Sequence, residues 1–370
     1  MKYVRSAMEI ESAEEVGYDN IQFNFAESSI MDGQVKDIPV SLDELVLEYG
    51  SHQGKTELRE IIAADGDGLK ADDVLTTMGA GGALFALATT LLEPGDHVVV
   101  GFPNYAINLQ APRVTGANVD LLEQTFEGGF RVDIEELAER VTAETKFVSL
   151  TCPHNPTGSV LSMPELEKIV ELVEERGSYL ILDEIYREMH HGEPLPPAAT
   201  FSPRVISVAS LSKTYGLPGL RLGWLICRDA DLMETLLAAK EAMHISHSVV
   251  LEELAYAFLL DKDAHVEKTR QDIAAKFAVV KGWMEGQDYL EWVEPSGGVT
   301  CFPRLKADLD VDVDRFYEVL NDKYGTYVGP GHWFEVDRRY MRIGFGWPSK
   351  DQLQQGLGNI TRAVGEAMRA

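Results

Sequence analysis

The sequence predicts an α/β fold, in which a three-layer, mostly parallel sheet with helices on both faces is joined to a second, smaller α+β domain. The main observation is that short runs of β-branched and other apolar residues alternate with helical stretches between about Ala80 and Cys227. Most of these runs are continuously hydrophobic, as strands covered on both faces must be. The predicted strands are His97–Gly101, Asn118–Leu122, Phe147–Thr151, Tyr179–Leu182, Arg204–Val208 and Gly223–Cys227.

The helix between the third and fourth of these strands has the clearest boundaries. Ser162 followed by Glu165 forms a capping-box pattern at its start, and Gly177 stands where a helix commonly ends in left-handed backbone. One apolar face is expected to pack on the sheet, and its residues are Leu166, Ile169, Val170 and Val173.

The length of the chain predicts two domains. It has 370 residues, whereas single hydrophobic cores stop growing at roughly 250 to 300 residues. After about Leu251 the pattern changes to long amphipathic helices, and strand signals return at Val299–Phe302 and Tyr340–Ile343. We therefore expect a large domain over residues 46–250, and a small domain that combines residues 1–45 with residues 251–370.

The composition excludes several classes of function. A formal net charge of −27 would repel nucleic acids and anionic membranes, so neither is an expected partner, although a salt-adapted host could also account for this acidity. Residues 1–15 lack the apolar core of a signal peptide, and the longest apolar stretch, residues 83–92, is too short to cross a bilayer. The odd number of cysteines and their strand-like surroundings favour a reducing cytoplasm over a disulfide framework; they are Cys152, Cys227 and Cys301. The nine histidines show no zinc spacing, so no metal is expected.

The run from residue 210 to residue 223 carries the most chemistry. It places Lys213 among hydroxyls, glycines and an arginine directly after a predicted strand. A lysine amine can condense with an aldehyde, and Ser210, Ser212 and Arg221 can bind a phosphate through hydrogen bonds and charge. The run therefore predicts a site for an aldehyde cofactor that carries a phosphate.

Other polar side chains follow the predicted strands at their carboxyl ends, where ligands bind in sheets of this type. Tyr105 and Asn155 each come after a strand, and Asp183 ends one, where a carboxylate is costly without a cationic partner. The glycine-rich stretch Gly79–Ala83 precedes a predicted helix over Leu84–Leu92, so its backbone N–H groups can face a phosphate.

Four motifs, taken in this order, resemble those of the fold-type I aminotransferases, which use pyridoxal phosphate (PLP). They are Gly79-Ala80-Gly81-Gly82-Ala83, His154-Asn155-Pro156-Thr157-Gly158, Leu182-Asp183-Glu184-Ile185-Tyr186 and the run around Lys213, and the resemblance extends from about Tyr49 to Arg342. It implies that Lys213 forms a Schiff base with PLP and moves the proton at the substrate Cα.

The resemblance also assigns the other cofactor contacts. Asp183 would pair with the pyridine nitrogen, and Tyr186 and Asn155 would donate hydrogen bonds to the phenolate oxygen. Tyr105 would stack on the ring. Ala80, Gly81 and Gly82 offer backbone amides but no hydroxyl, so phosphate binding would depend on the hydroxyls and the guanidinium of the Lys213 run; these belong to Ser210, Ser212 and Arg221.

Substrate and partner contacts complete what the resemblance implies. Arg342 would hold the substrate α-carboxylate by two parallel hydrogen bonds, with Asn155 and Ala26 as further substrate contacts. Tyr49 would reach the phosphate of the neighbouring subunit's cofactor, which implies a homodimer with shared active sites.

The activity implied is transfer of the amino group of an α-amino acid to a 2-oxo acid. A PLP-dependent lyase, cyclase or oxidase of an amino acid would use the same residues, so these reactions remain alternatives. A binding or regulatory module that retains the cofactor is a further alternative, which the strong acidity disfavours. The residues named here do not predict the side chain of the substrate or the identity of the acceptor.

Overall fold

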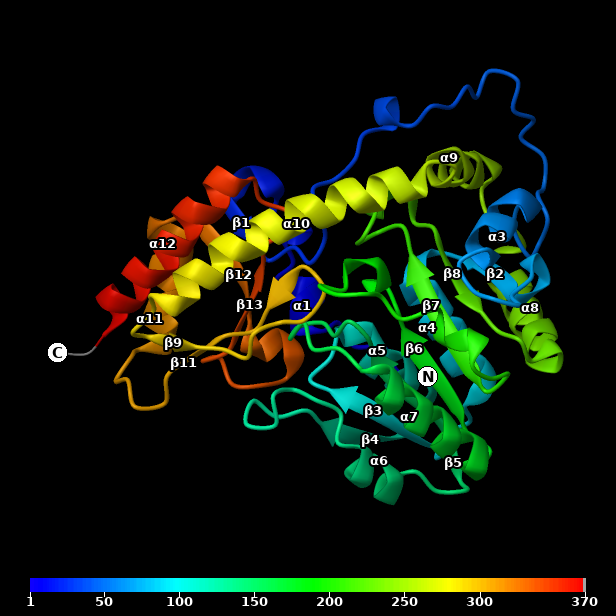
Figure 1. Cartoon of the computed structure of the whole chain (residues 1–370), viewed down its shortest axis with the longest axis horizontal. Helices are drawn as coiled ribbons and strands as arrows, with labels where there is room; N and C mark the ends of the chain where they lie inside the picture. The colour runs from blue at the N-terminus through cyan, green and yellow to red at the C-terminus, as the bar shows by residue number, and fades with distance from the viewer. Residues whose placement is uncertain (369–370) are drawn as a thin grey trace.

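The computed structural model, which describes residues 1–368, contains the predicted sheet (Figure 1). Its strands follow the order β2-β8-β7-β6-β5-β3-β4, in which β8 is antiparallel to both neighbours and the other adjacent pairs are parallel. The strands are β2 (Val74–Thr77), β3 (His97–Phe102), β4 (Asn118–Glu123), β5 (Thr145–Thr151), β6 (Tyr179–Asp183), β7 (Val205–Ser210) and β8 (Gly223–Ile226). All except β2 coincide with predicted runs, so the α/β prediction is confirmed.

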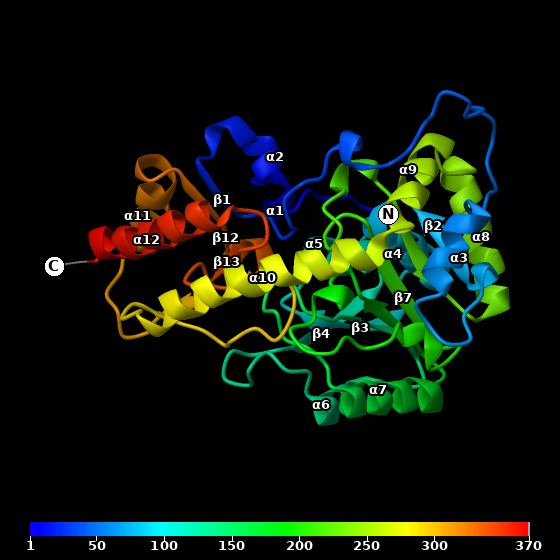
Figure 2. The same cartoon turned by 45° about the horizontal axis from the view of Figure 1, so that its top comes forward.

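Helices cover both faces of this sheet (Figure 2). On one face, α4 (Gly79–Leu91), α5 (Ala106–Thr115) and α8 (Ala230–His244) share a core with the strands, and on the other face α6 (Ile134–Arg140) and α7 (Met163–Arg176) do so. A third cluster joins α3 (Thr56–Ala63) and α9 (Val249–Leu259) to the edge formed by β2 and β8. Val98, Val99 and Val100 in β3 are fully buried, which explains why the predicted strands are continuously apolar.

The starts of two helices can be compared with the sequence patterns that predict them. In α7, Ser162 and Glu165 form the predicted capping box, and Gly177 ends the helix with a left-handed φ of 70°. The predicted start at Leu84 of the helix that follows β2 was wrong, because that helix, α4, begins at Gly79. Only the first glycine of the stretch needs a positive φ, and the residues that follow it continue as helix.

A second, four-stranded sheet lies beside the first, in the order β1-β12-β13-β10. It combines β1 (Phe23–Phe25) with β10 (Thr300–Cys301), β12 (Thr326–Pro330) and β13 (Met341–Gly344), and a small antiparallel pair, β9 (Leu290–Glu291) and β11 (Arg304–Leu305), flanks it. The helices of this part are α10 (Lys262–Glu285), α11 (Val313–Glu318) and α12 (Lys350–Ala367), with the short α1 (Ala7–Ile10) and α2 (Ala13–Val16) near the amino terminus. The strand signals around residues 300 and 341 are therefore confirmed as β10 and β13.

The long helix α10 runs from the first sheet to the second in both views (Figures 1 and 2). Within residues 1–368, no helix combines the length and the apolar character needed to cross a membrane. Because β5, β6 and β7 are parallel neighbours, their carboxyl ends meet at one edge of the large sheet, and the residues that follow them are brought together there.

Candidate active site

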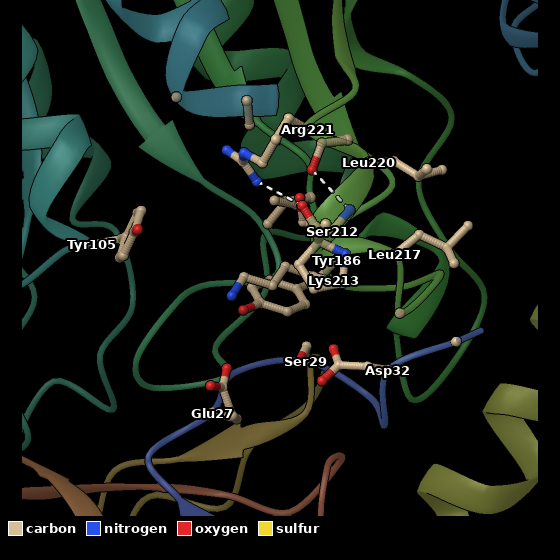
Figure 3. A pocket seen from close by; sticks show the side chains of 18 of the residues that line it. Glu27, Ser29, Asp32, Tyr105, Tyr186, Ser212, Lys213, Leu217, Leu220 and Arg221 are labelled. Atoms are coloured by element: carbon tan, nitrogen blue, oxygen red, sulfur yellow. Dashed lines mark hydrogen bonds between the residues drawn. The ribbon is translucent and has the colours of Figure 1, made fainter. Parts of the chain in front are cut away.

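A cavity of about 1030 Å³ opens at this edge of the large sheet. Most of the residues predicted to hold a cofactor line it, namely Ala80, Gly81, Tyr105, Asn155, Asp183, Tyr186, Ser210, Ser212, Lys213 and Arg221. In Figure 3, Arg221 and Ser212 lie at one end, Lys213 and Tyr186 lie in the middle, and the amino-terminal segment with Glu27 lies opposite. The cavity is therefore bounded by the large sheet on one side and by residues 9–35 on the other.

Lys213 lies in the loop that follows β7, and its side chain borders the middle of the cavity (Figure 3). Its Nζ has no hydrogen-bond or ion-pair partner among the described residues. Burial lowers the pKa of this amine, and the carboxylate of Glu27 partly opposes that effect. A lysine with a lowered pKa is more often neutral, which is the form that attacks an aldehyde.

Asp183 is the last residue of β6 and is only 4 % exposed. Its carboxylate accepts hydrogen bonds from Nδ2 of Asn108 at 3.2 Å and from the backbone N–H of Ile185 at 3.3 Å. Burial raises the pKa of Asp183 to about 6, although these two donors and the charge of Lys213 oppose the shift. A cation held next to Asp183 would remove the cost of burying its charge.

Sequence reasoning missed Asn108. It lies on the buried face of α5, and its Oδ1 has no hydrogen-bond partner among the described residues. The only sequence signal was one asparagine within a largely apolar helical stretch, which does not identify the strand end that it faces.

The end of the cavity near Arg221 has the features of an anion site. Arg221 has left-handed backbone with a φ of 49°, and its Nη1 donates to the carbonyl oxygen of Pro218 at 2.9 Å. A Cβ added to Gly79 would lie 2.9 Å from Arg221 Nη2, and one added to Gly223 would lie 2.5 Å from the backbone of Gly79. The two glycines therefore allow β8, the start of α4 and the guanidinium to meet closely, with free N–H groups of α4 beside a positive charge.

Not all of the predicted phosphate contacts are equivalent. Ala80 and Gly81 line the cavity within the first turn of α4, whereas Gly82 is not among the lining residues. As the fourth residue of the helix, Gly82 has a backbone N–H directed toward the carbonyl before the helix, so that N–H is not one of the free donors. The hydroxyl of Ser210 accepts a hydrogen bond from the backbone N–H of Ser212 at 3.2 Å.

The two predicted phenolate donors and the predicted stacking residue already have protein partners. Tyr186 donates its hydroxyl to the carbonyl oxygen of Ser28 at 2.6 Å, and burial raises the pKa of that phenol, so it remains a donor. Tyr105 is the residue before α5, and its hydroxyl lies 3.4 Å from a carboxylate oxygen of Glu9. Asn155 accepts a hydrogen bond from Arg342 through Oδ1, which leaves its Nδ2 available as a donor.

Arg342 lies in β13 of the second sheet and is only 3 % exposed. Nη1 donates to Oδ1 of Asn155 at 3.1 Å and Nη2 donates to the carbonyl oxygen of Ala26, while Nε has no hydrogen-bond partner in the described part of the chain. Within residues 1–368, no carboxylate lies within ion-pair distance of this guanidinium. Burying an arginine without an anion is costly, so its surroundings suit a carboxylate ligand. Ala26 contributes its backbone oxygen to this arrangement rather than its side chain.

Tyr49 lies away from the cavity within one chain. Its side chain is 80 % exposed and borders a separate hollow together with residues of the segments around Lys55 and Val249. Within residues 1–368, Tyr49 does not line the cavity that Lys213 borders.

Sequence reasoning also missed the acidic side chains on the amino-terminal side of the cavity. They belong to Glu9, Glu14, Glu27 and Asp32. In so acidic a chain these residues carried no distinguishing signal, and their approach to the cavity depends on the path of residues 9–35 across the two sheets.

Comparisons with known proteins show similarity to one enzyme family over most of the chain. The family model described as aminotransferase class I and II matches residues 24–360. The chain is 31 % identical to capreomycidine synthase of Streptomyces vinaceus, over 89 % of this chain and 84 % of the relative, and 29 % identical to a probable N-acetyl-LL-diaminopimelate aminotransferase of Bacillus subtilis, over 86 % and 82 %. Among solved structures, a PLP-dependent aminotransferase from Streptococcus suis superposes with a TM-score of 0.92 at 27 % identity, over the full length of both chains.

Proposed function

This chain belongs to the aminotransferase class I and II family, whose members are PLP-dependent enzymes, and on that premise we propose that the cavity around Lys213 is its active site. The observation that carries the proposal is that three charged groups lie in or next to one cavity without forming an ion pair within residues 1–368. Lys213 and the buried Asp183 line the cavity, and the buried Arg342 contacts Asn155, which also lines it. These are the sites that a PLP aldehyde, a pyridinium nitrogen and an α-carboxylate would fill.

The residues present fit PLP. The guanidinium of Arg221, the hydroxyls of Ser210 and Ser212 and the free N–H groups at the start of α4 suit the phosphate, and Asp183 suits the pyridine nitrogen. Asn155 can donate through Nδ2 to the phenolate oxygen. Tyr186 lines the cavity, and its hydroxyl would turn from the carbonyl oxygen of Ser28 to donate to the same oxygen. Tyr105 borders the space expected for the ring. When bound, PLP supplies an electron sink that stabilises negative charge at the substrate Cα.

The chain's own side chains then perform the remaining tasks. Lys213 carries the proton to and from the substrate Cα, which requires its amine to be neutral for part of the cycle, and its lowered pKa favours that. Arg342 fixes the α-carboxylate, and the carbonyl oxygen of Ala26 together with Asn155 holds the guanidinium in place. The reaction proposed is transfer of an amino group from an α-amino acid to a 2-oxo acid.

We also propose a homodimer in which Tyr49 completes the neighbouring active site. This is supported by the exposure of Tyr49 beside Val46 and Leu47, which are 66 % and 76 % exposed. The test mixes inactive Tyr49→Phe and Lys213→Ala proteins under subunit exchange. Hybrids that regain activity support the shared site, and a protein that stays monomeric at working concentration contradicts it.

Two smaller proposals concern location and domains. Cys152, Cys227 and Cys301 are free and buried, which supports a location in a reducing cytoplasm.

The division into a large domain of residues 46–250 and a small domain of residues 1–45 plus 251–370 is supported by the second sheet. This sheet takes β1 from residues 1–45 and its other strands from residues 251–370.

The competing reaction is a lyase, cyclase or oxidase activity. It remains an alternative because one of the similar proteins, capreomycidine synthase, is named as a synthase and not as an aminotransferase. A single-turnover experiment separates them: the PLP-loaded protein is mixed with a panel of amino acids and no acceptor. An aminotransferase releases at most one oxo acid per active site, then stops until a 2-oxo acid is added. Continued release of ammonia, peroxide or a cyclised product without an acceptor would instead favour the competing reaction.

A further inference from the structure

The wall of the cavity opposite the anion site carries an excess of negative charge. Four carboxylates of the amino-terminal segment line it, and in Figure 3 Glu27 and Asp32 lie across from Arg221, with Lys213 between them. Including Asp183, the described lining holds five carboxylates against two cations, which are Lys213 and Arg221. Both cations are already assigned to the cofactor. The carboxylates of the amino-terminal segment are therefore available to bind the substrate.

Glu27 and Asp32 accept hydrogen bonds from neutral donors. Glu27 accepts a hydrogen bond from the hydroxyl of Tyr18 at 2.9 Å, and Asp32 accepts one from Nε1 of Trp347 at 3.1 Å. The two donor rings are stacked, with centroids 6.2 Å apart and an angle of 14° between their planes. Glu27 and Asp32 are therefore held by one aromatic pair, and no ion pair neutralises either of them within residues 1–368.

This combination suits an organic cation. Carboxylates beside an aromatic face bind ammonium and guanidinium groups through charge, hydrogen bonds and the ring quadrupole. A metal ion is a poorer match, because no group of three or more metal-ligating side chains is arranged to hold one among the described residues.

Arg342 supplies an independent indication of the ligand. It is buried, its Nε has no hydrogen-bond partner in the described chain, and the amide of Asn155, which it contacts, lines the same cavity. An anionic group is therefore expected at Arg342 and a cationic group at Glu27 and Asp32. An α-amino acid with a positively charged side chain carries both groups.

We propose that this active site selects amino acids whose side chain bears a guanidinium or ammonium group, with Glu27 as the main contact and Asp32 as the second. The inference rests on the proposed function, because it takes Lys213 and Arg342 as the points that fix the substrate backbone. Glu27 is the stronger candidate because it is half-buried, whereas Asp32 is exposed and more fully screened by solvent.

The kinetic test compares arginine with citrulline, which has nearly the same shape but no side-chain charge, and includes lysine to distinguish guanidinium from ammonium. We expect kcat/KM for arginine or lysine to exceed that for citrulline by about tenfold or more, the size of one charged hydrogen bond. Glu27→Gln keeps an acceptor for Tyr18, and it should lower the ratio of kcat/KM for arginine to kcat/KM for citrulline to near one. The ratio is the readout because the charge of Glu27 also acts on Lys213, and that effect is common to both substrates. Asp32→Asn should lower the same ratio to a smaller degree.

Glu15→Gln is the matched control, because it removes one charge from the same segment at a residue that pairs with Arg5 and does not line the cavity. It should leave the ratio between arginine and citrulline unchanged. Equal use of arginine and citrulline by the unaltered protein, or an equal loss on both in Glu27→Gln, would overturn the inference.

A binding measurement separates the failure of this inference from the failure of the proposed function. Calorimetry on the PLP-loaded protein compares 5-guanidinopentanoate with 5-ureidopentanoate, neither of which has an amino group to transfer. Tighter binding of the guanidino compound, lost in Glu27→Gln, supports the charge preference even if no amino acid is transaminated. Equal binding of the two compounds, together with transamination of neutral amino acids, refutes the preference and leaves the aminotransferase proposal intact.

Discussion

The two walls of the cavity are built differently. The sheet wall consists of residues at or just after the carboxyl ends of β5, β6 and β7 and at the start of α4, where parallel pairing fixes the backbone and most side chains are buried. The opposite wall consists of residues 9–35, where the helices are short and Glu9, Glu14 and Asp32 are exposed. The rigid wall is suited to cofactor chemistry, which needs accurate placement, and the irregular wall is suited to choosing the substrate.

This contrast predicts two kinds of variant. Changes in the sheet wall should affect all substrates alike, because they act on the cofactor or on the proton at Cα. Changes in the amino-terminal wall should affect some substrates and spare others. Variants of the sheet wall and of Arg342 can therefore be compared directly with the variants of Glu27.

The largest effect is expected for Lys213→Ala. Losing both the attachment point of PLP and the group that moves the Cα proton should lower kcat by about 10⁴-fold or more on every amino acid. Lys168→Ala, which removes an exposed lysine of α7, is the control and should be fully active. Borohydride reduction and peptide mapping provide the direct check, and a pyridoxyl group on any other lysine would contradict the assignment.

Asp183→Asn should lower kcat by roughly 10²-fold or more while PLP still binds, because a neutral amide cannot keep the pyridine nitrogen protonated. Near-normal turnover with all amino acids would contradict the role given to Asp183.

The same variant should have the opposite effect on the stability of the PLP-free protein. Burial raises the pKa of Asp183 from 3.8 to about 6, so between these pH values the folded state binds more protons than the unfolded state. The contribution of Asp183 to the free energy of unfolding is therefore most favourable below pH 4 and becomes less favourable as the pH rises to 6. Without PLP, Asp183→Asn should therefore be more stable than the unaltered protein at pH 7, by at most about 3 kcal/mol, and the difference should vanish near pH 4. Denaturant unfolding at the two pH values tests this.

Much of the sheet wall could be predicted from the sequence because its signals are local. Continuous apolar runs identified β3 to β8, and polar residues at the ends of those runs identified Asp183 and Lys213. The strand β2 was missed because Val74–Thr77 is only four residues long and half of it is threonine. The start of α4 was misjudged because glycines usually break helices, whereas here they are needed for close approach to Arg221 and β8.

The amino-terminal wall could not be predicted in the same way. Glu27 and Asp32 reach the cavity because β1 pairs with β12, about 300 residues later in the chain, and no local pattern encodes that pairing. Asn108 was missed for a related reason, since its contact with Asp183 depends on how α5 packs against the sheet.

Arg342→Lys tests a residue that contacts both walls of the cavity, through Asn155 on one side and Ala26 on the other. An ammonium cannot reproduce the planar pair of hydrogen bonds, so KM for amino acids should rise by about tenfold or more while the dissociation constant of PLP stays the same. Arg338→Lys, at a partly exposed arginine between β12 and β13 that pairs with Asp314, is the control. The loss should be equal for arginine and citrulline, since both carry the α-carboxylate. A loss confined to one of them would mean that Arg342 contacts the side chain instead.

The smallest effect is expected at the phosphate end of the sheet wall, where the first turn of α4 offers backbone amides but no hydroxyl. Gly81 has room for a side chain, because a Cβ there would meet only Cγ1 of Ile107, at 3.9 Å. Gly81→Ser should therefore add one hydrogen bond to the phosphate and tighten PLP binding several-fold, equivalent to about 1 kcal/mol. Gly81→Ala is the matched control, because it places a Cβ at the same position without gaining a donor. The serine variant should bind PLP more tightly than the alanine variant, and the ratio of arginine to citrulline turnover should be the same in both, since this end of the cavity does not face the substrate side chain. Equal PLP affinity in the two variants would mean that the phosphate does not lie at the start of α4, and a changed substrate ratio would mean that the two walls do not divide cofactor binding from substrate choice.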